Sequence, residues 1–131
     1  MAIQAITMAE PFYKQYRRSV DFIQHYIFPG ACLLSLRHFT GSLAKTSLRL
    51  VHLEDITPHY ARTLSIWRRR FLERIDDVKA LGFSDSFALL WEYYLAYCEA
   101  GFLERRIGNV QMILAKPGAH VEIIASKGAR S

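Results

Sequence analysis

The sequence of 131 residues contains only two cysteines, Cys32 and Cys98, and no long hydrophobic run. Two cysteines exclude the disulfide framework of small secreted domains, and no secretory signal precedes them, so a reducing cytoplasm is the expected location. The longest stretch without Asp, Glu, Lys or Arg covers residues 22–36 and contains Pro29 and Gly30. Because this stretch is too short to span a bilayer, any contact with lipid is expected to be peripheral.

The chain also lacks a glycine-rich loop between a strand and a helix, and it has no P-loop. A cofactor held by its phosphates is therefore not indicated. The five histidines show no ligand spacing to each other or to the cysteines, so no metal site is expected. Spacing alone yields no Ser/His/Asp or Cys/His catalytic set.

The composition, 51% hydrophobic and 13% aromatic, is sufficient for one domain with a core. The formal net charge of +5 would suit nucleic acid or an anionic lipid surface. The basic residues are spread along the chain, however, and solvated helix flanks explain them best. Attraction to anionic headgroups is the functional alternative, and no nucleic-acid partner is expected.

Hydrophobic periodicity and turn residues predict an α/β layer arrangement with three strands. The pattern places a domain at 1–117 and a tail at 118–131, in which residues 121–124 could add a short edge strand. The predicted strands are 3–7, 48–53 and 109–115. The predicted helices are one from Pro11 to the stop at Pro29, a weaker one at 33–43, one from Pro58 to Gly82, and one from the N-cap Ser84 to about Arg106.

The last of these helices carries an unusual run of aromatic residues between Trp91 and Phe102. At helical spacing Trp91, Tyr94, Leu95, Cys98 and Phe102 share one face. Such a face usually fills a core. Buried tyrosines need hydrogen-bond partners, however, so the residues leave open a pocket for a long apolar ligand.

Tyr60 stands in the first turn of a predicted helix, directly after Pro58 and His59. There its hydroxyl could lie beside exposed backbone N–H groups at the positive end of the helix dipole, a geometry that suits an anion. Tyr60 could equally just begin the apolar stripe of the helix.

Three separated motifs, 22–30, 58–64 and 93–102, resemble in order and spacing the C-terminal part of cyclopropane-fatty-acyl-phospholipid synthases and the related mycolic acid cyclopropane synthases. The resemblance covers about residues 3–117. It implies the C-terminal part of a class I, Rossmann-like methyltransferase fold. The three strands would be the fifth, sixth and seventh of the full sheet, with the last antiparallel between the other two.

Enzymes of this family transfer a methyl group from S-adenosylmethionine to the cis double bond of an acyl chain, with bicarbonate as the base. By resemblance Tyr60, the backbone of Ile6, and Gln4 belong to the bicarbonate site, Gln4 standing where other members have a histidine. Phe28, Tyr94 and Cys98 match positions that line the acyl channel, and the aromatic helix becomes one wall of it. Ala31 stands where a second glycine is usual and Leu34 where proline is usual, which puts the conformation of this loop in question.

The family's S-adenosylmethionine loop, catalytic glutamate and cysteine match nothing in this chain. A truncated or split gene product is therefore expected, which alone binds neither S-adenosylmethionine nor bicarbonate well and does not catalyse transfer. Its expected partners are phospholipid acyl chains and an N-terminal methyltransferase fragment. The alternative is a non-catalytic module that binds lipid or a partner through the acyl pocket or the open sheet edge.

Overall fold

The computed structural model describes residues 1–119 and has an α/β fold around a three-stranded sheet. The strands are β1 (Ala2–Met8), β2 (Arg49–Asp55) and β3 (Ile107–Ala115). Their order is β1-β3-β2, and β3 is antiparallel to both neighbours. This confirms the predicted half-sheet with its last strand in the centre. The register pairs Ile6 with Asn109 across β1 and β3.

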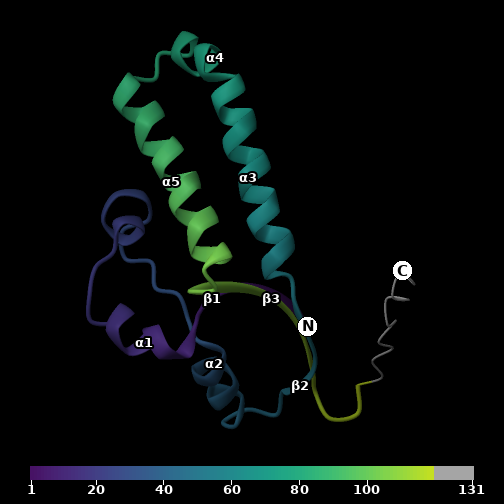
Figure 1. The fold of residues 1–131 in the computed structure, drawn as a ribbon. Coiled ribbons are helices and arrows are strands. Elements are labelled where there is room, and N and C mark those ends of the chain that lie inside the picture. The colour runs from purple at the N-terminus through teal and green to yellow at the C-terminus, as the bar shows by residue number, and fades with distance from the viewer. Residues whose placement is uncertain (120–131) are drawn as a thin grey trace.

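Helices cover the sheet unequally. The helical segments are α1 (Glu10–Tyr16), the π-helical turn η1 (Ile23–Ile27), α2 (Leu36–Leu43), α3 (Thr57–Glu73), α4 (Ile75–Ala80) and α5 (Asp85–Leu103). Helices α3 and α5 rise together from one side of the sheet, joined at the far end by α4, whereas α1 and α2 lie towards the other side (Figure 1). The sheet therefore serves as a base for a long helical hairpin.

A single helix from Pro11 to Ile27 was the wrong interpretation of the first apolar stripe. Helix α1 ends at Tyr16, and the hydroxyl of Ser19 donates to the carbonyl of Gln15 at 3.2 Å. Two residues later, the Asp21 carboxylate accepts from the backbone N–H of Gln24, while the Gln24 side chain accepts from the backbone N–H of Asp21. Such reciprocal hydrogen bonds are typical of the start of a helix. They begin a new helical turn at Asp21, although the apolar residues continue at helical spacing through this segment.

The two long helices were predicted more closely. Ser84 accepts a hydrogen bond from the N–H of Phe87 at 3.2 Å and thus caps α5 as expected. Gly82 follows α4 with a φ of +91°, a conformation that favours glycine, which explains the stop. The predicted helix up to Gly82 is, however, divided at Arg74, whose φ and ψ of −114° and 21° leave the helical region. The Arg74 guanidinium forms an ion pair with the carboxylate of Asp77 in α4.

The core lies between α3 and α5, where Ala61, Leu64, Leu95 and Phe102 are buried. Ile6 and Ile107 pack against this cluster from the sheet. The aromatic stripe of α5 is thus divided: Leu95 and Phe102 belong to the core, while Tyr94 and Cys98 are only half buried at its edge. Sequence alone could not make this distinction, because one helical face contacts both the core and a cavity.

Residues 120–131, with the expected edge strand at 121–124, lie outside the described part of the chain. None of the helices within residues 1–119 combines the length and the apolar character needed to cross a membrane.

Candidate functional site

A cavity of about 480 Å³ lies between β1, residues 12–33 and the C-terminal half of α5. Its wall is mainly apolar and aromatic, and its volume falls in the range of small-molecule binding sites. The apolar and aromatic lining residues are Ile6, Met8, Phe12, Tyr16, Ile23, Phe28, Ala31, Leu33, Tyr94, Tyr97, Cys98, Ala100, Phe102 and Ile107.

All three residues that the resemblance assigns to an acyl channel line this cavity: Phe28, Tyr94 and Cys98. The rings of Phe28 and Tyr94 meet edge to face, with 6.1 Å between centroids. Tyr94 and Cys98 lie one helical turn apart on α5, whereas Phe28 follows η1. The fold therefore brings these residues together from two separate segments.

Burial keeps the side chains of Tyr94 and Cys98 uncharged at neutral pH. It raises the pKa of the Tyr94 phenol to about 12 and the pKa of the Cys98 thiol to about 11. A thiol with such a pKa carries almost no thiolate near pH 7 and is a poor nucleophile. This part of the wall is therefore suited to contact with apolar groups, and Cys98 is not suited to nucleophilic attack.

The three residues assigned to the bicarbonate site are less closely grouped. Ile6 lines the cavity and packs against the core, and Tyr60 packs against the same core, with its ring 5.0 Å from that of Phe102. Gln4 is exposed, and its side-chain oxygen accepts from Nε2 of Gln111 at 3.0 Å. Gln4 and Ile6 are two residues apart on β1 and therefore share one sheet face.

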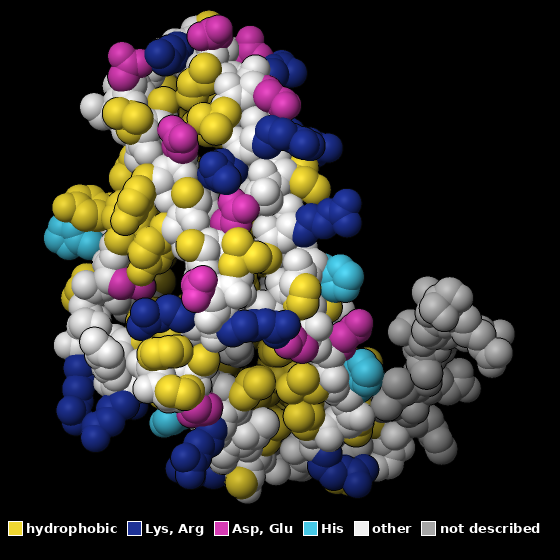
Figure 2. Space-filling model, in the orientation of Figure 1, with side chains coloured by type: hydrophobic (Ala, Val, Ile, Leu, Met, Phe, Trp, Pro, Cys, Tyr) yellow, Lys and Arg dark blue, Asp and Glu magenta, His cyan; other side chains and the backbone are white. Residues whose placement is uncertain are grey.

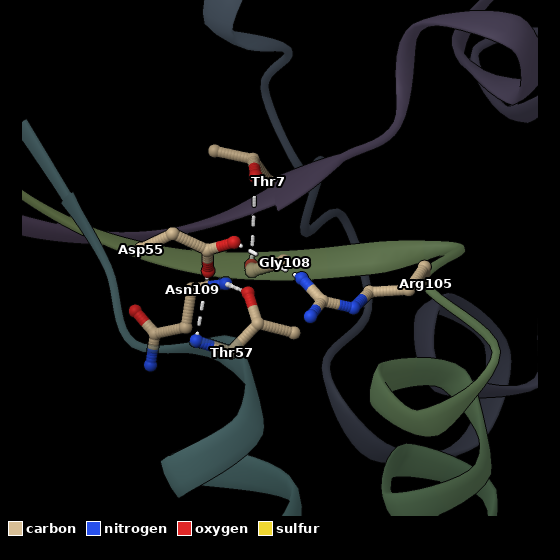
Figure 3. Close-up of polar contacts among 6 residues, drawn as sticks. All are labelled: Thr7, Asp55, Thr57, Arg105, Gly108 and Asn109. Atoms are coloured by element: carbon tan, nitrogen blue, oxygen red, sulfur yellow. Dashed lines mark hydrogen bonds and ion pairs between the residues drawn. The ribbon is translucent and has the colours of Figure 1, made fainter. Parts of the chain in front are cut away.

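Two of the backbone N–H groups at the start of α3 already have partners within the chain. The N–H of Thr57 already donates to the Asp55 carboxylate at 2.9 Å, and the N–H of Tyr60 donates to the carbonyl of Ile56. Figure 3 shows Asp55 between Thr57 and Arg105, whose Nη1 donates to it at 3.0 Å. The Asp55 carboxylate thus already lies at the positive end of the helix, where an external anion would compete with it.

The loop at residues 28–34 is held by residues whose role the sequence analysis missed. The Tyr16 hydroxyl accepts from the N–H of Leu33 at 3.0 Å, and Nε2 of Gln24 donates to the carbonyl of Ala31 at 2.9 Å. Gly30 alone in this loop adopts a positive φ, +82°, so an alanine at position 31 causes no backbone strain. The Asp-x-x-Gln spacing at 21–24 was the available signal for this ordered turn.

Hydrophobic side chains also reach the surface beside the cavity. Figure 2 shows such side chains gathered along α5. Tyr93 is 54% exposed, and its ring lies 4.7 Å from that of Phe22, which also contacts Tyr26 and Tyr97. These side chains form an aromatic patch on the described surface.

Comparisons with known proteins agree with this geometry. A family profile described as mycolic acid cyclopropane synthetase matches residues 1–112. The chain is 43% identical over 119 residues to the tuberculostearic acid methyltransferase UfaA1 of Mycobacterium tuberculosis. It is 30% identical over 95 residues to the cyclopropane-fatty-acyl-phospholipid synthase of Escherichia coli. The alignments include 90% and 72% of this chain, respectively.

A solved structure shares the fold. The mycolic acid cyclopropane synthase CmaA1, crystallised with SAH and CTAB, superposes with a TM-score of 0.78 over 88% of this chain at 24% identity. The chain corresponds to only part of each relative: 28% of the length of UfaA1, 24% of the Escherichia coli synthase and 44% of the CmaA1 chain.

Proposed function

The chain belongs to the mycolic acid cyclopropane synthetase family, and we propose that it is the C-terminal segment of an enzyme that transfers a methyl group from S-adenosylmethionine to an unsaturated acyl chain of a lipid. One observation carries this proposal: Phe28, Tyr94 and Cys98 come from separate segments and line one apolar cavity. The relatives named above are lipid methyltransferases and cyclopropane synthases, which supports the same substrate class.

In this proposal the chain contributes the acyl-binding wall of the site. The uncharged side chains of Tyr94 and Cys98 and the edge of Phe28 exclude water from the acyl chain. Methyl transfer to an alkene places positive charge on the acyl carbon atoms. Aromatic rings stabilise a nearby cation, and a dry site protects it from water.

S-adenosylmethionine does not fit the residues of this chain, because no glycine-rich loop follows any of the three strands. We therefore propose that the chain alone is inactive. Bicarbonate fits better, since the Tyr60 hydroxyl, the Gln4 amide and the Ile6 backbone are groups that can hydrogen-bond to it. When bound, bicarbonate would supply a base for the proton that leaves the substrate.

The test is reconstitution. The chain is expressed alone and together with the S-adenosylmethionine-binding part of UfaA1, and methyl transfer from labelled S-adenosylmethionine to vesicles of a cis-unsaturated phospholipid is measured. Label should enter the lipid only when both parts are present, and Phe28→Ala should reduce it. Labelling by the 131-residue chain alone, or no labelling by a stable complex of the two parts, would contradict the proposal.

A second candidate is a non-catalytic module that binds lipid or a partner through the cavity or through the outer edge of β1, where Thr7 already pairs with Leu34. The exposed aromatic patch of Phe22, Tyr26, Tyr93 and Tyr97 favours it, since such patches mark interaction sites. Fatty acid that copurifies with the chain, without any methyltransferase fragment, would support the module. Copurification with such a fragment supports the split enzyme.

Contact with lipid would be peripheral in either case. Vesicle flotation with anionic and neutral phospholipids tests this, because a positively charged chain should float more with the anionic vesicles at low salt. Equal flotation with anionic and with neutral vesicles would mean that the aromatic patch alone accounts for the binding.

A further inference from the structure

The opening of the cavity is polar, although its wall is mainly apolar. Its polar and charged lining residues are mostly exposed: Gln15, Ser19, Asp21, Gln24, Glu104 and Arg106. Deeper in the lining, Phe102 is buried. A molecule that fills this cavity would meet apolar groups inside and charged groups at the opening. This distribution fits an amphiphile, which has a hydrocarbon tail and a charged head.

Arg106 is the only positively charged residue among the described residues that line the cavity. Its guanidinium carbon lies 4.3 Å from the centroid of the Phe12 ring, which also lines the cavity. A guanidinium held over an aromatic face keeps its N–H groups free at the edge, where they can donate to an oxyanion. The neighbouring Arg105 pairs with Asp55, whereas no carboxylate within residues 1–119 forms an ion pair with Arg106. Its donors are therefore available to a ligand.

Two carboxylates, those of Asp21 and Glu104, belong to the same lining. Asp21 and Arg106 both lie near the phenol of Tyr97. Burial raises the pKa of this phenol, the negative charge of Asp21 raises it further, and the positive charge of Arg106 lowers it. A head with only a negative charge would thus be attracted by Arg106 and repelled by the two carboxylates.

A head that carries both charges suits all of these groups. A phosphate can accept two hydrogen bonds from the edge of one guanidinium, and a carboxylate attracts a positively charged amine. The Asp21 carboxylate is held at the cavity, because its Oδ1 accepts from the backbone N–H of Gln24 at 2.8 Å. These charges favour an amphiphile with a phosphate and a cationic amine in its head over a free fatty acid.

We propose that Arg106, Asp21 and Glu104 form a headgroup subsite at the opening of the cavity: Arg106 donates to the phosphate of a zwitterionic phospholipid, the two carboxylates attract its amine, and an acyl chain lies in the cavity. The inference deepens the proposed function, on which it rests, because it names the kind of lipid head. It also gives a reason for the charged residues in an otherwise apolar lining.

The test is calorimetric titration of the purified chain with single-chain amphiphiles below the concentration at which they form micelles. All probes carry a decyl chain, and only their heads differ: phosphocholine, phosphate, trimethylammonium and the uncharged maltoside. Decyl phosphocholine should bind most tightly. Arg106→Gln should raise the Kd of both phosphate probes about tenfold, a modest loss because the arginine is exposed, and should leave the Kd of decyl maltoside unchanged.

Arg17→Gln is the matched control. Arg17 also lies over an aromatic ring, 5.9 Å from the centroid of Tyr13, but it does not line the cavity, so this variant should change no Kd. Asp21→Asn keeps an acceptor oxygen for the N–H of Gln24 and removes only the charge. It should weaken binding of decyl phosphocholine and strengthen binding of decyl phosphate.

Three results would overturn the inference: equal affinity of the unaltered chain for decyl phosphocholine and decyl maltoside, the same loss in Arg106→Gln and Arg17→Gln, or changes of the same sign for both phosphate probes in Asp21→Asn. Methyl transfer by the reconstituted enzyme tests the proposed function separately. If label enters the lipid while the probes show no preference for a phosphate head, the proposed function stands and the headgroup subsite does not.

Discussion

The ring of Phe28 meets the ring of Tyr94 edge to face, at an angle of 84° between their planes. Phe28 ends a five-residue π-helical turn, whereas Tyr94 lies in the middle of the 19-residue helix α5. Both rings line the cavity, so the shape of its wall here depends on how the loop after η1 is held against α5.

Replacing Phe28 by alanine should weaken binding of a fluorescent cis-unsaturated fatty acid by about tenfold. The ring is half exposed without ligand, so the lost burial corresponds to roughly 1–1.5 kcal/mol. Titration followed by fluorescence gives the Kd. Val20→Ala, a change at a 70% exposed position outside the cavity lining, is the control. Equal Kd values for both variants would exclude Phe28 from the ligand site.

The two cysteines should react with iodoacetamide at very different rates at pH 8. Cys32 is exposed, whereas burial raises the pKa of Cys98 to about 11, so only about 0.1% of Cys98 is thiolate at this pH. Intact-mass spectrometry should show one rapid alkylation, absent from Cys32→Ser, and a second only in urea. Rapid double labelling of the folded chain would contradict the burial of Cys98.

Asp55→Asn should destabilise the chain at pH 7 by about 0.5–1 kcal/mol, a modest effect because the carboxylate is half exposed. Hydrogen bonds from Thr57, with Arg105 nearby, hold the pKa of Asp55 below its usual value. The stabilisation is thus complete above the unfolded-state pKa of about 4 and is lost as the pH falls through the lower folded-state value.

Urea unfolding from pH 7 to pH 3 measures this effect. The difference between Asp55→Asn and the unaltered chain should shrink at the acid end of the range. Glu54→Gln removes the neighbouring carboxylate without touching Thr57 or Arg105 and serves as the control. A difference that stays constant with pH would show that the Asp55 charge contributes nothing to stability.

Phe102→Ala should destabilise the chain by about 3–5 kcal/mol, because the ring is 2% exposed and packs between α3 and α5. The neighbouring Leu103 is 64% exposed, and Leu103→Ala should change the free energy of unfolding by no more than about 0.5 kcal/mol. Chemical denaturation of both variants makes the comparison. Similar losses would mean that the core does not lie where the structure places it.

Local patterns predicted the three strands, the N-cap at Ser84 and the stop at Gly82, because these depend on residues that are close in sequence. The same approach failed between Arg17 and Asp21. There the apolar period continues, but the side chains of Ser19, Asp21 and Gln24 bind the backbone and interrupt the helix. Hydrogen bonds from such side chains to the backbone can be predicted from the Asp-x-x-Gln spacing at 21–24. The spacing of hydrophobic residues does not reveal them.

The candidate site was predicted only in part. The resemblance assigned Phe28, Tyr94 and Cys98 to one channel, and in the structure all three line one cavity, while their roles in binding stay predictions. Asp55 at the start of α3 was missed, since its effect on the expected anion geometry depends on bonds within the folded turn. Arg106 was predicted only as the end of a helix, because the cavity beside it is formed by segments that are far apart in sequence.

The sequence by itself determined the family, the elements and the aromatic face of α5, because these follow from motif order and from the periods of helices and strands. Only the tertiary structure decided which residues of that face fill the core and which line the cavity. It also decided that Asn109 lies opposite Ile6 in the sheet. The physical reason is that strand register joins residues more than a hundred positions apart, and no local propensity encodes such a pairing.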